Sequence, residues 1–249
     1  MREPWHSDRQ EGTYRLVPPS FYNRPALELA PCLLGSLLVH ETTEGITAGI
    51  VVETEAYAGP EDRAAHSFAD RRSERTAIMY DTPGKAYIFA IYGMYWCCNV
   101  VAGPGRKPEA VLIRALQPTE GIDLMRARRS HRAQLHSIAT KPPEESASSP
   151  LAKTRTLSDQ QLTSGPGRLC QAMGIDQQCY GLAFFDPASP LHLYAPQESL
   201  SSAAIATGPR IGIAYAGAWA TKPWRFWIKG NPYVSASKAP ASKLGHLSP

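Results

Sequence analysis

The sequence predicts a single α+β domain built on a curved, mostly antiparallel sheet, with surrounding helices and a protruding β-hairpin. Two observations predict this class. Many short apolar runs alternate as strands do, while only a few segments have helical spacing. The order of these segments also lacks the strand, helix, strand rhythm that produces a parallel sheet. With 249 residues, 43% of them hydrophobic, the chain is long enough to bury a sizeable core.

Apolar spacing predicts the individual elements, and Gly and Pro residues mark the breaks between them. In the first half we expect an amphipathic helix over 21–38 that runs into a strand at 35–40, a strand over 47–57, a short helix over 61–68, and hairpin arms over 86–91 and 94–101 with Tyr92 and Gly93 at the tip. In the second half we expect a strand over 111–116, a helix over 121–129, a helix capped by Thr163 or Ser164 that continues to Met173, and strands over 182–185, 191–194, 210–215 and 225–228.

Three segments are expected to lie outside the ordered domain. Residues 130–161 are rich in Ser, Pro, Lys, Arg and Glu, with few large apolar side chains to offset the entropy of ordering, which predicts a mobile insertion. We also expect a flexible N-terminal segment over 1–15 and a disordered tail over 236–249. The ordered domain is therefore predicted to span residues 16–235.

Charge and cysteine content narrow the class of protein. A formal net charge of +4 permits a polyanionic partner without requiring one. The five cysteines include no C-x-x-C pair and do not accompany clustered histidines, so neither a disulfide framework nor a structural zinc is expected. The adjacent Cys97 and Cys98 are interpreted as small buried groups in a reducing compartment. We therefore expect an intracellular protein.

The most apolar stretch, residues 86–102, needs to be tested as a membrane span because it is almost wholly uncharged. Its aromatic and β-branched content, the break at Gly93, and Asn99, which would lack partners in lipid, favour strand, turn and strand instead. The N-terminal residues also lack the apolar core of a secretory signal. No association with a membrane is expected.

Two carboxylates share one face of the strand over 47–57. Period-two alternation places Glu53, Glu55 and Tyr57 on the same side. The two glutamates are then roughly 6 to 7 Å apart at the backbone, a separation that suits acid and base work on a glycosidic bond. The competing interpretation is that the glutamates are solvated or pair with nearby arginines. For this segment taken alone, the competing interpretation is the stronger one.

Aromatic side chains gather near this acidic pair. They are Tyr57, His66, Tyr87, Phe89, Tyr92, Tyr95 and Trp96. Aromatic residues often form core, but a hairpin tip has little core to fill, so Tyr92 is more easily explained as a wedge or a contact residue. Asn99 and Arg114 place polar groups within predicted strands, where they must find partners if they are buried.

Several longer runs of residues are specific enough to point to a family. They are 53–66 (ETEAYAGPEDRAAH), 83–84 (PG), 87–95 (YIFAIYGMY), 111–118 (VLIRALQP), 164–170 (SGPGRLC) and 210–213 (RIGI). Through these runs, which recur in order over most of residues 16–235, the chain resembles the alkyladenine, or 3-methyladenine, DNA glycosylases. The resemblance implies a monofunctional DNA-repair hydrolase of base excision repair. Such an enzyme flips alkylated or deaminated purine nucleotides out of duplex DNA, cleaves the bond between base and sugar, and leaves an abasic site.

The resemblance also assigns roles to single residues. It implies that Glu55 is the general base, that Arg114 lies near the attacking water and the target phosphate, and that Glu53 is structural. The base pocket would be lined by Tyr57, His66, Phe89 and Asn99, the last of which crowds the 2-amino group of normal guanine. DNA intercalation would fall to Tyr92, inserted through the minor groove, and to Met79, which probes the opposite strand. Position 89 is often tyrosine in the family, so Phe89 keeps the stacking surface and loses a hydroxyl contact.

The expected partner is double-stranded DNA containing damaged purines, bound by a monomer that needs no cofactor and no metal. We expect the protein in the cytoplasm, at the nucleoid, of a bacterium or in the nucleus of a eukaryote. Two other functions stay open at this point. One is a carbohydrate-active glycoside hydrolase that uses Glu53 and Glu55 as acid and base. The other is a non-catalytic DNA-binding protein that uses the hairpin as a wedge.

Overall fold

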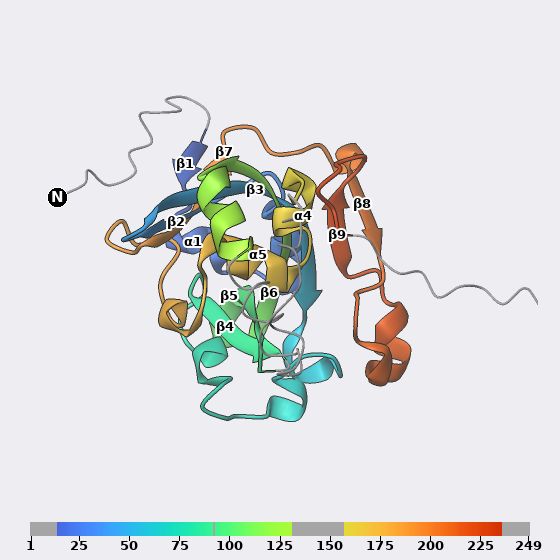
Figure 1. Cartoon of the computed structure of the whole chain (residues 1–249). Coiled ribbons are helices and arrows are strands. Elements are labelled where there is room, and N and C mark those ends of the chain that lie inside the picture. Colours follow the sequence, from blue (N-terminus) through green and yellow to red (C-terminus); the bar gives the residue numbers. More distant parts are fainter. Residues whose placement is uncertain (1–13, 92, 131–156, 236–249) are drawn as a thin grey trace, which may run out of the picture.

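A nine-stranded sheet with helices around it forms the protein, as the computed structural model shows over the residues it describes, 14–91, 93–130 and 157–235 (Figure 1). The strands are β1 (Tyr14–Leu16), β2 (Leu37–Thr42), β3 (Gly45–Tyr57), β4 (Ala86–Ile91), β5 (Tyr95–Ala102), β6 (Glu109–Glu120), β7 (Leu191–Pro196), β8 (Ile205–Gly208) and β9 (Arg225–Ile228). All pairs between these strands are antiparallel. The predicted α+β class with an antiparallel sheet is therefore confirmed.

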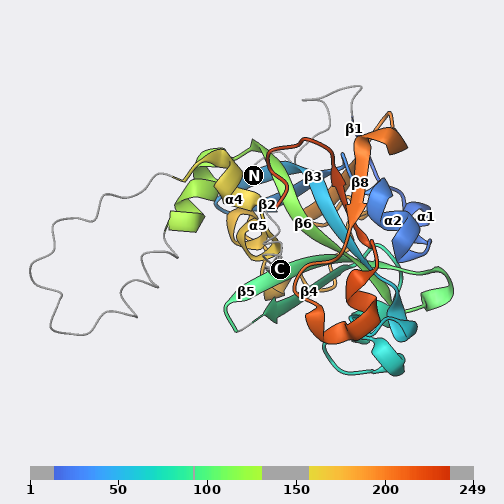
Figure 2. The same cartoon turned by 90° about the vertical axis from the view of Figure 1, so that its right-hand side faces the viewer.

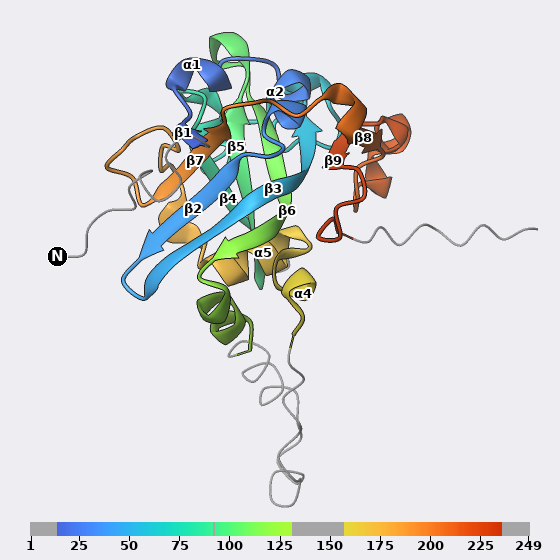
Figure 3. The ribbon, with the colours of Figure 1, turned by 90° about the horizontal axis from the view of Figure 1, so that it is seen from above.

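The order of strands across the sheet is β1-β7-β2-β3-β6-β5-β4, and β9 pairs with both β3 and β8. The long strand β3 thus has two successive neighbours on one side. Its first part, 45–50, pairs with β2, and Glu53–Glu55 pair with β9. Seen from above, β2, β3 and β6 run side by side across the molecule, and β9 lies beyond the far end of β3 (Figure 3). The acidic pair therefore lies where the sheet changes partners.

The helices are short. The α-helices are α1 (Pro19–Tyr22), α2 (Ala26–Cys32), a helix over 122–130, α4 (Asp159–Thr163) and α5 (Pro166–Met173). The 3₁₀ helices are η2 (Gly59–Glu61), η3 (Phe68–Asp70), η4 (Ala77–Tyr80), η5 (Pro104–Arg106), η7 (Gln177–Cys179), η8 (Ser202–Ala204) and η9 (Ala214–Thr221). Helix α5 packs against β5 and β6, and α2 packs against β3 and β6. Buried residues of both helices belong to the main apolar core, which also takes in Cys98, as expected for a small buried group.

Several expected elements are present with altered bounds. The hairpin arms are β4 and β5, and the strands expected at 47–57, 111–116, 191–194 and 225–228 correspond to β3, β6, β7 and β9. The single helix expected over 21–38 is instead two helices, because Pro25 disfavours helical geometry at the residue before it. The helix ending at Met173 begins after Gly165, with Pro166 in its first turn, rather than after Thr163 or Ser164. Ser158 instead caps α4 in a capping box with Gln161.

Three expected elements are wrong. No α-helix forms over 61–68, because the Asp62 carboxylate accepts the backbone N–H groups of Ala58 and Ala64 and so stabilises turns. Residues 182–185 form only one isolated bridge, between Ala183 and Lys85. Residues 210–215 form a loop that enters η9, because the Ile211 backbone N–H is donated to a side chain and not to a neighbouring strand.

The boundaries of the expected flexible segments also differ in part. Tyr14 and Arg15 pair with β7, and residues 157–161 lead into and begin α4, so these residues belong to the fold. Residues 1–13, 131–156 and 236–249, on which the predictions of flexibility mainly fall, lie outside the described residues. None of the helices that the structure describes has both the length and the apolar content that a membrane span requires.

The connection between β5 and β6 offers a matched test of the backbone. A Cβ at Gly103 would lie 2.1 Å from the Lys107 carbonyl oxygen, whereas a Cβ at Gly105 would meet nothing within 4 Å. Both glycines have positive φ, 105° and 63°, so either alanine costs about 1 to 2 kcal/mol of backbone strain. We expect Gly103→Ala to lower the free energy of unfolding by at least about 2 kcal/mol more than Gly105→Ala, measured by urea denaturation. Equal losses would contradict the described loop.

Candidate active site

The acidic pair on β3 lies at an irregularity of the sheet. The register between β3 and β6 shifts on each side of Glu53, and neither Val52 nor Arg114 has a direct partner in it. Such bulges add a residue to one strand, bend it and redirect side chains. Glu53 and Glu55 nevertheless contact the same arginine, Arg114, which places both carboxylates on one side of the sheet as the alternation predicts.

Arg114 lies between the two glutamates. Its Nε donates to Glu53 Oε1 at 3.1 Å, and its Nη1 is 3.3 Å from Glu55 Oε1. Burial lowers the pKa of the Arg114 guanidinium, but the charges of Glu55 and Glu53 outweigh this effect and raise the pKa. Arg114 is therefore a permanent cation inside the protein, and it compensates charges that would otherwise be costly to bury.

Among the described residues, the Glu53 carboxylate accepts hydrogen bonds only from groups that do not line the cavity beside Glu55, apart from Arg114. Besides Arg114, its Oε1 accepts from Arg225 Nη1 at 3.1 Å, and its Oε2 accepts from the Ser235 backbone N–H at 2.7 Å. The residue is completely buried. These bonds join β3, β6, β9 and the end of the described chain, so Glu53 holds the sheet together at this point.

Glu55 accepts hydrogen bonds from groups that line a cavity. Its Oε1 accepts from the Ile211 backbone N–H at 2.7 Å, and its Oε2 accepts from the Tyr57 hydroxyl at 2.9 Å. Burial and the charge of Glu55 raise the pKa of Tyr57 well above its ordinary value, so the hydroxyl stays protonated and donates. Glu55 itself is 0% exposed and does not line the cavity. Its carboxylate thus lies one layer behind the cavity wall.

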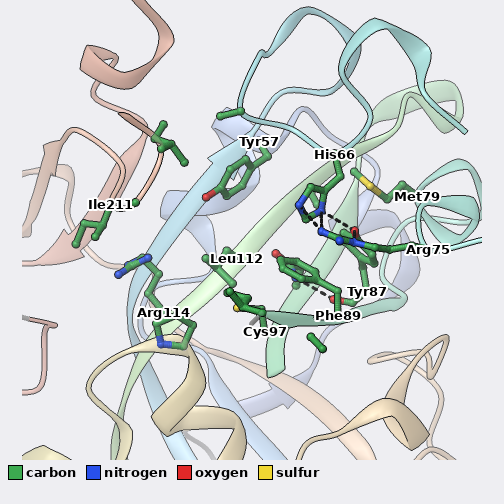
Figure 4. Close-up of a pocket in the computed structure, with 18 of the residues that line it drawn as sticks. Tyr57, His66, Arg75, Met79, Tyr87, Phe89, Cys97, Leu112, Arg114 and Ile211 are labelled. Carbon is green, nitrogen blue, oxygen red and sulfur yellow. Dashed lines mark hydrogen bonds between the residues drawn. The ribbon is translucent and has the colours of Figure 1, made fainter. Parts of the chain in front are cut away.

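The cavity has a volume of about 520 Å³, within the range of roughly 300 to 1,000 Å³ common for small-molecule sites. The segment 58–82 and the loop before η9 meet here at one end of the sheet (Figure 2). The predicted site residues that line it are Tyr57, His66, Met79, Phe89, Asn99 and Arg114. Figure 4 shows Tyr57, His66 and Phe89 turned toward a common space. Most of the site residues predicted from the sequence therefore lie around one cavity.

Three aromatic rings form one side of the cavity. His66 meets Phe89 edge to face, with ring centroids 4.6 Å apart, and Tyr87 lies 5.2 Å from Phe89. The Tyr87 hydroxyl is 2.8 Å from His66 Nδ1. Tyr57 has the Arg210 guanidinium 4.7 Å from its ring centroid, which fixes the ring in the cavity wall. A flat apolar ligand would find stacking partners here.

The polar members of the cavity are held by their own partners. The Asn99 amide donates to the Tyr87 carbonyl oxygen at 2.9 Å and is 3% exposed, so its position is fixed. Cys97 lines the cavity as a buried group, and burial raises the pKa of its thiol to about 12. Among the described residues, no group of His, Cys, Asp and Glu side chains has an arrangement that could hold a metal ion.

Two residues predicted to intercalate into DNA are Met79 and Tyr92. Met79 lies in η4 and is 1% exposed, packed with Ile78, Tyr87 and Val101 at the cavity wall. The core encloses Met79 in the free protein, and its contact with the opposite DNA strand stays a prediction. Tyr92 lies outside the described residues. Its neighbour Met94 is 44% exposed, which makes it an apolar side chain open to solvent at the hairpin.

Sequence reasoning missed four contributors to the site. They are Arg75, whose guanidinium lies 4.7 Å from the Phe89 ring centroid; the backbone N–H of Ile211; Arg210, which covers Tyr57; and Tyr215, which is 73% exposed at the cavity. The arginine-rich run 71–75 and the run 210–213 were visible signals. Neither run, however, indicates which distant residues it contacts in the fold.

A fixed carboxylate directly behind an aromatic cavity is typical of an enzyme that acts on a flat, ring-shaped group. Comparison with known proteins gives the family. The model of the methylpurine-DNA glycosylase family matches residues 20–232. The chain therefore belongs to this family, and it is a DNA-repair glycosylase, as the resemblance in the sequence predicted.

Individual relatives agree with the family match. The chain is 43% identical to a Bacillus cereus protein over 221 residues, which cover 88% of this chain and 98% of the relative. It is 46% identical to a Bacillus licheniformis protein over 222 residues, covering 88% of this chain and 96% of the relative. Both carry the name "Putative 3-methyladenine DNA glycosylase". The similarity thus extends over nearly the whole length of each relative.

The surroundings of His66 in the cavity predict its protonation state. Burial and the nearby Arg75 charge lower the pKa of His66 from 6.5 to about 4. Between pH 6.5 and about pH 4, the His66 ring binds a proton in the unfolded chain and not in the folded protein. The contribution of neutral His66 to the free energy of unfolding is therefore complete above pH 6.5 and is lost as the pH falls toward 4. We expect NMR titration to show a neutral His66 ring down to about pH 5. A midpoint near the ordinary histidine value would contradict the described surroundings.

Proposed function

We propose that the chain removes damaged purines from double-stranded DNA by binding the everted nucleotide in the aromatic cavity and hydrolysing its N-glycosidic bond with Glu55. One observation carries the proposal: the Glu55 carboxylate is held directly behind the wall of a cavity lined by Tyr57, His66 and Phe89. A purine stacked in a duplex hides its glycosidic carbon, so a cavity of this kind is reached only by a nucleotide rotated out of the helix.

Stacking on the aromatic wall offsets the cost of eversion. Unpairing and unstacking cost a few kcal/mol, and each aromatic platform returns about 1 to 3 kcal/mol. Tyr57 and Phe89 supply such surfaces, and stacking tolerates many ring substituents. A preference for alkylated or deaminated purines follows, because weakened pairing lowers the cost of eversion. Asn99, fixed by its bond to Tyr87, is placed to limit substituents on the bound ring.

Glu55 activates the attacking water. Cleavage proceeds through a sugar with oxocarbenium character, which an adjacent anion stabilises, and the same anion accepts the proton of the incoming water. In the described structure Glu55 Oε2 accepts from the Tyr57 hydroxyl, so a water must take the place of this bond when substrate binds. Arg114 and the Ile211 N–H hold Oε1, which fixes the carboxylate during this exchange.

The departing base determines whether cleavage also needs a proton donor. An alkylated purine carries positive charge and leaves without protonation. His66 is neutral at physiological pH because burial and Arg75 lower its pKa to about 4, so its ring offers one donor and one acceptor to the edge of a bound base. We therefore assign His66 to base recognition.

The two alternative functions fit less well. A glycoside hydrolase of the ordinary kind needs two available carboxylates, but Glu53 is occupied by Arg114, Arg225 and the Ser235 N–H. A non-catalytic DNA binder has no use for a buried carboxylate held beside a cavity. We retain the hairpin wedge as part of the glycosylase proposal, with Tyr92 filling the gap left by the nucleotide and exposed Met94 beside it.

We further propose that the protein acts as a monomer inside the cell, where its DNA substrate lies. Cys32, Cys97, Cys98, Cys170 and Cys179 are all free thiols. Four of them are buried, so they serve as packing groups, and the state of all five fits a reducing compartment.

Replacing Glu55 tests the catalytic assignment. We expect Glu55→Gln to lower the single-turnover rate of base release by at least about 100-fold, because the amide neither stabilises positive charge nor accepts a proton from water. DNA binding should persist. The assay scores free base from duplexes that contain 7-methylguanine, hypoxanthine or ethenoadenine. Glu61→Gln, at an exposed glutamate of η2, is the matched control and should leave the rate unchanged. Normal base release by Glu55→Gln would refute the assignment.

The cavity also predicts the product. Among the described residues that line it there is no lysine to form a Schiff base with the sugar. We expect purified protein to leave an intact strand with an abasic site, which alkali then cleaves. Gel analysis of end-labelled duplex with and without alkali measures this directly. Strand breaks that appear without alkali, and that borohydride converts to a protein–DNA adduct, would contradict a monofunctional enzyme.

A further inference from the structure

A second pocket, of about 450 Å³, adjoins the aromatic cavity. The two share Ala64, His66, Arg75 and Tyr215, so these residues form the wall between them. The second pocket is lined mainly by the segment 63–76, which connects η2 to η4. It belongs neither to the set of residues that hold Glu55 nor to the hairpin.

The lining of this second pocket is strongly cationic. It includes Arg63, Arg71 and Arg75 and no Asp or Glu side chain. Within the part of the chain that the structure describes, none of these three arginines has a carboxylate within ion-pair distance. Like charges that converge on a concave surface without counter-ions create a site for an anion.

The hydroxyl groups in this pocket are already satisfied. Ser73 Oγ and Thr76 Oγ1 lie 3.1 Å apart, Thr76 Oγ1 accepts from the Ser73 N–H, and Thr76 is 2% exposed. These bonds fix the loop that carries Arg71 and Arg75. The unused hydrogen-bonding capacity of the pocket therefore lies in the guanidinium groups, whose planar forks suit phosphate oxygens.

Arg75 connects the two pockets. Its guanidinium carbon lies 4.7 Å from the Phe89 ring centroid, its Nε is 3.4 Å from the Tyr87 hydroxyl, and its Nη2 contacts the His66 ring (Figure 4). Arg75 lines both the aromatic cavity and the second pocket, and in our proposal the purine stacks on the face of Phe89 that this guanidinium covers. A base entering there displaces the guanidinium, and the second pocket is the neighbouring space that can receive it.

We propose that the second pocket is a phosphate subsite that binds the DNA backbone beside the everted nucleotide through Arg63, Arg71 and Arg75. The inference rests on the proposed function and deepens it. An aromatic cavity and a cationic pocket that share one wall match the two parts of a nucleotide, a flat ring and an anionic phosphate. Binding of the base and release of Arg75 toward the phosphate are then coupled steps, which makes eversion dependent on the backbone contact.

Salt dependence of DNA binding tests the subsite. We use a duplex with a tetrahydrofuran abasic analogue, which has no base to release, so the measurement is independent of turnover. Each lost phosphate contact reduces the slope of log K against log salt concentration by about 0.9. We expect Arg63→Gln and Arg71→Gln each to show this reduction and a roughly tenfold weaker affinity at fixed salt.

Two further variants separate a specific contact from a general change in charge. Arg72 is also exposed, but it lies 3.9 Å from Asp70 and does not line the pocket, so Arg72→Gln should keep the wild-type slope. Arg71→Lys keeps the charge and should restore most of the slope. The proposal is overturned if Arg63→Gln and Arg71→Gln keep the wild-type slope, or if Arg72→Gln reduces it equally.

The outcomes also distinguish this proposal from the proposed function. If wild-type protein releases methylated purines but the two pocket variants bind with an unchanged slope, only the subsite is wrong. If wild-type protein releases no base from any damaged duplex, the proposed function is wrong, whatever the slopes show. Inorganic phosphate that protects the protein thermally, without any effect of Arg63→Gln or Arg71→Gln on the DNA slope, would also overturn the subsite, because it would show an ion site unrelated to DNA.

Discussion

The site depends on one interaction, the contact of Arg114 with both Glu53 and Glu55 where the register of β3 and β6 shifts. Two buried carboxylates side by side would repel each other and lose hydration, at a cost of several kcal/mol for each ion. Arg114 and Arg225 supply two compensating cations. Because Glu53 is fully engaged in this network, Glu55 alone keeps an oxygen whose partner, the Tyr57 hydroxyl, can be exchanged. In the proposed function, the irregular strand pairing thus leaves Glu53 as the structural glutamate and Glu55 as the reactive one.

In the proposed function, Tyr57 links substrate binding to catalysis. Its ring belongs to the cavity wall and its hydroxyl donates to the Glu55 carboxylate, so the residue that we propose to stack the base also contacts the anion. A carboxylate held by Arg114 and the Ile211 N–H needs little reorganisation when positive charge develops on the sugar. In the same proposal, the Tyr57 hydroxyl keeps water away from Glu55 until a base occupies the cavity.

Local pattern predicted the parts of the site that depend on neighbours in the chain. Alternation along β3 placed the two glutamates on one face, and the two arms of the hairpin followed from their apolar runs. It did not predict that the loop at 210–215 donates a backbone N–H to Glu55 from 156 positions away, because a strand and a loop can share the same apolar spacing. The resemblance assigned Met79 a DNA contact without information on burial, and the core encloses that side chain. Long-range contacts decide these points, and one sequence does not contain them.

A crystal structure with substrate would show whether Glu55 and the aromatic cavity act on the same nucleotide. The duplex would carry a 2′-fluorinated ethenoadenine nucleotide, whose glycosidic bond resists hydrolysis. We expect the ethenoadenine ring between Tyr57 and Phe89, with a water hydrogen-bonded to Glu55 Oε2 in place of the Tyr57 hydroxyl and facing the sugar carbon. A base bound elsewhere, or a Glu55 carboxylate still covered by Tyr57 with the ring fully seated, would contradict it.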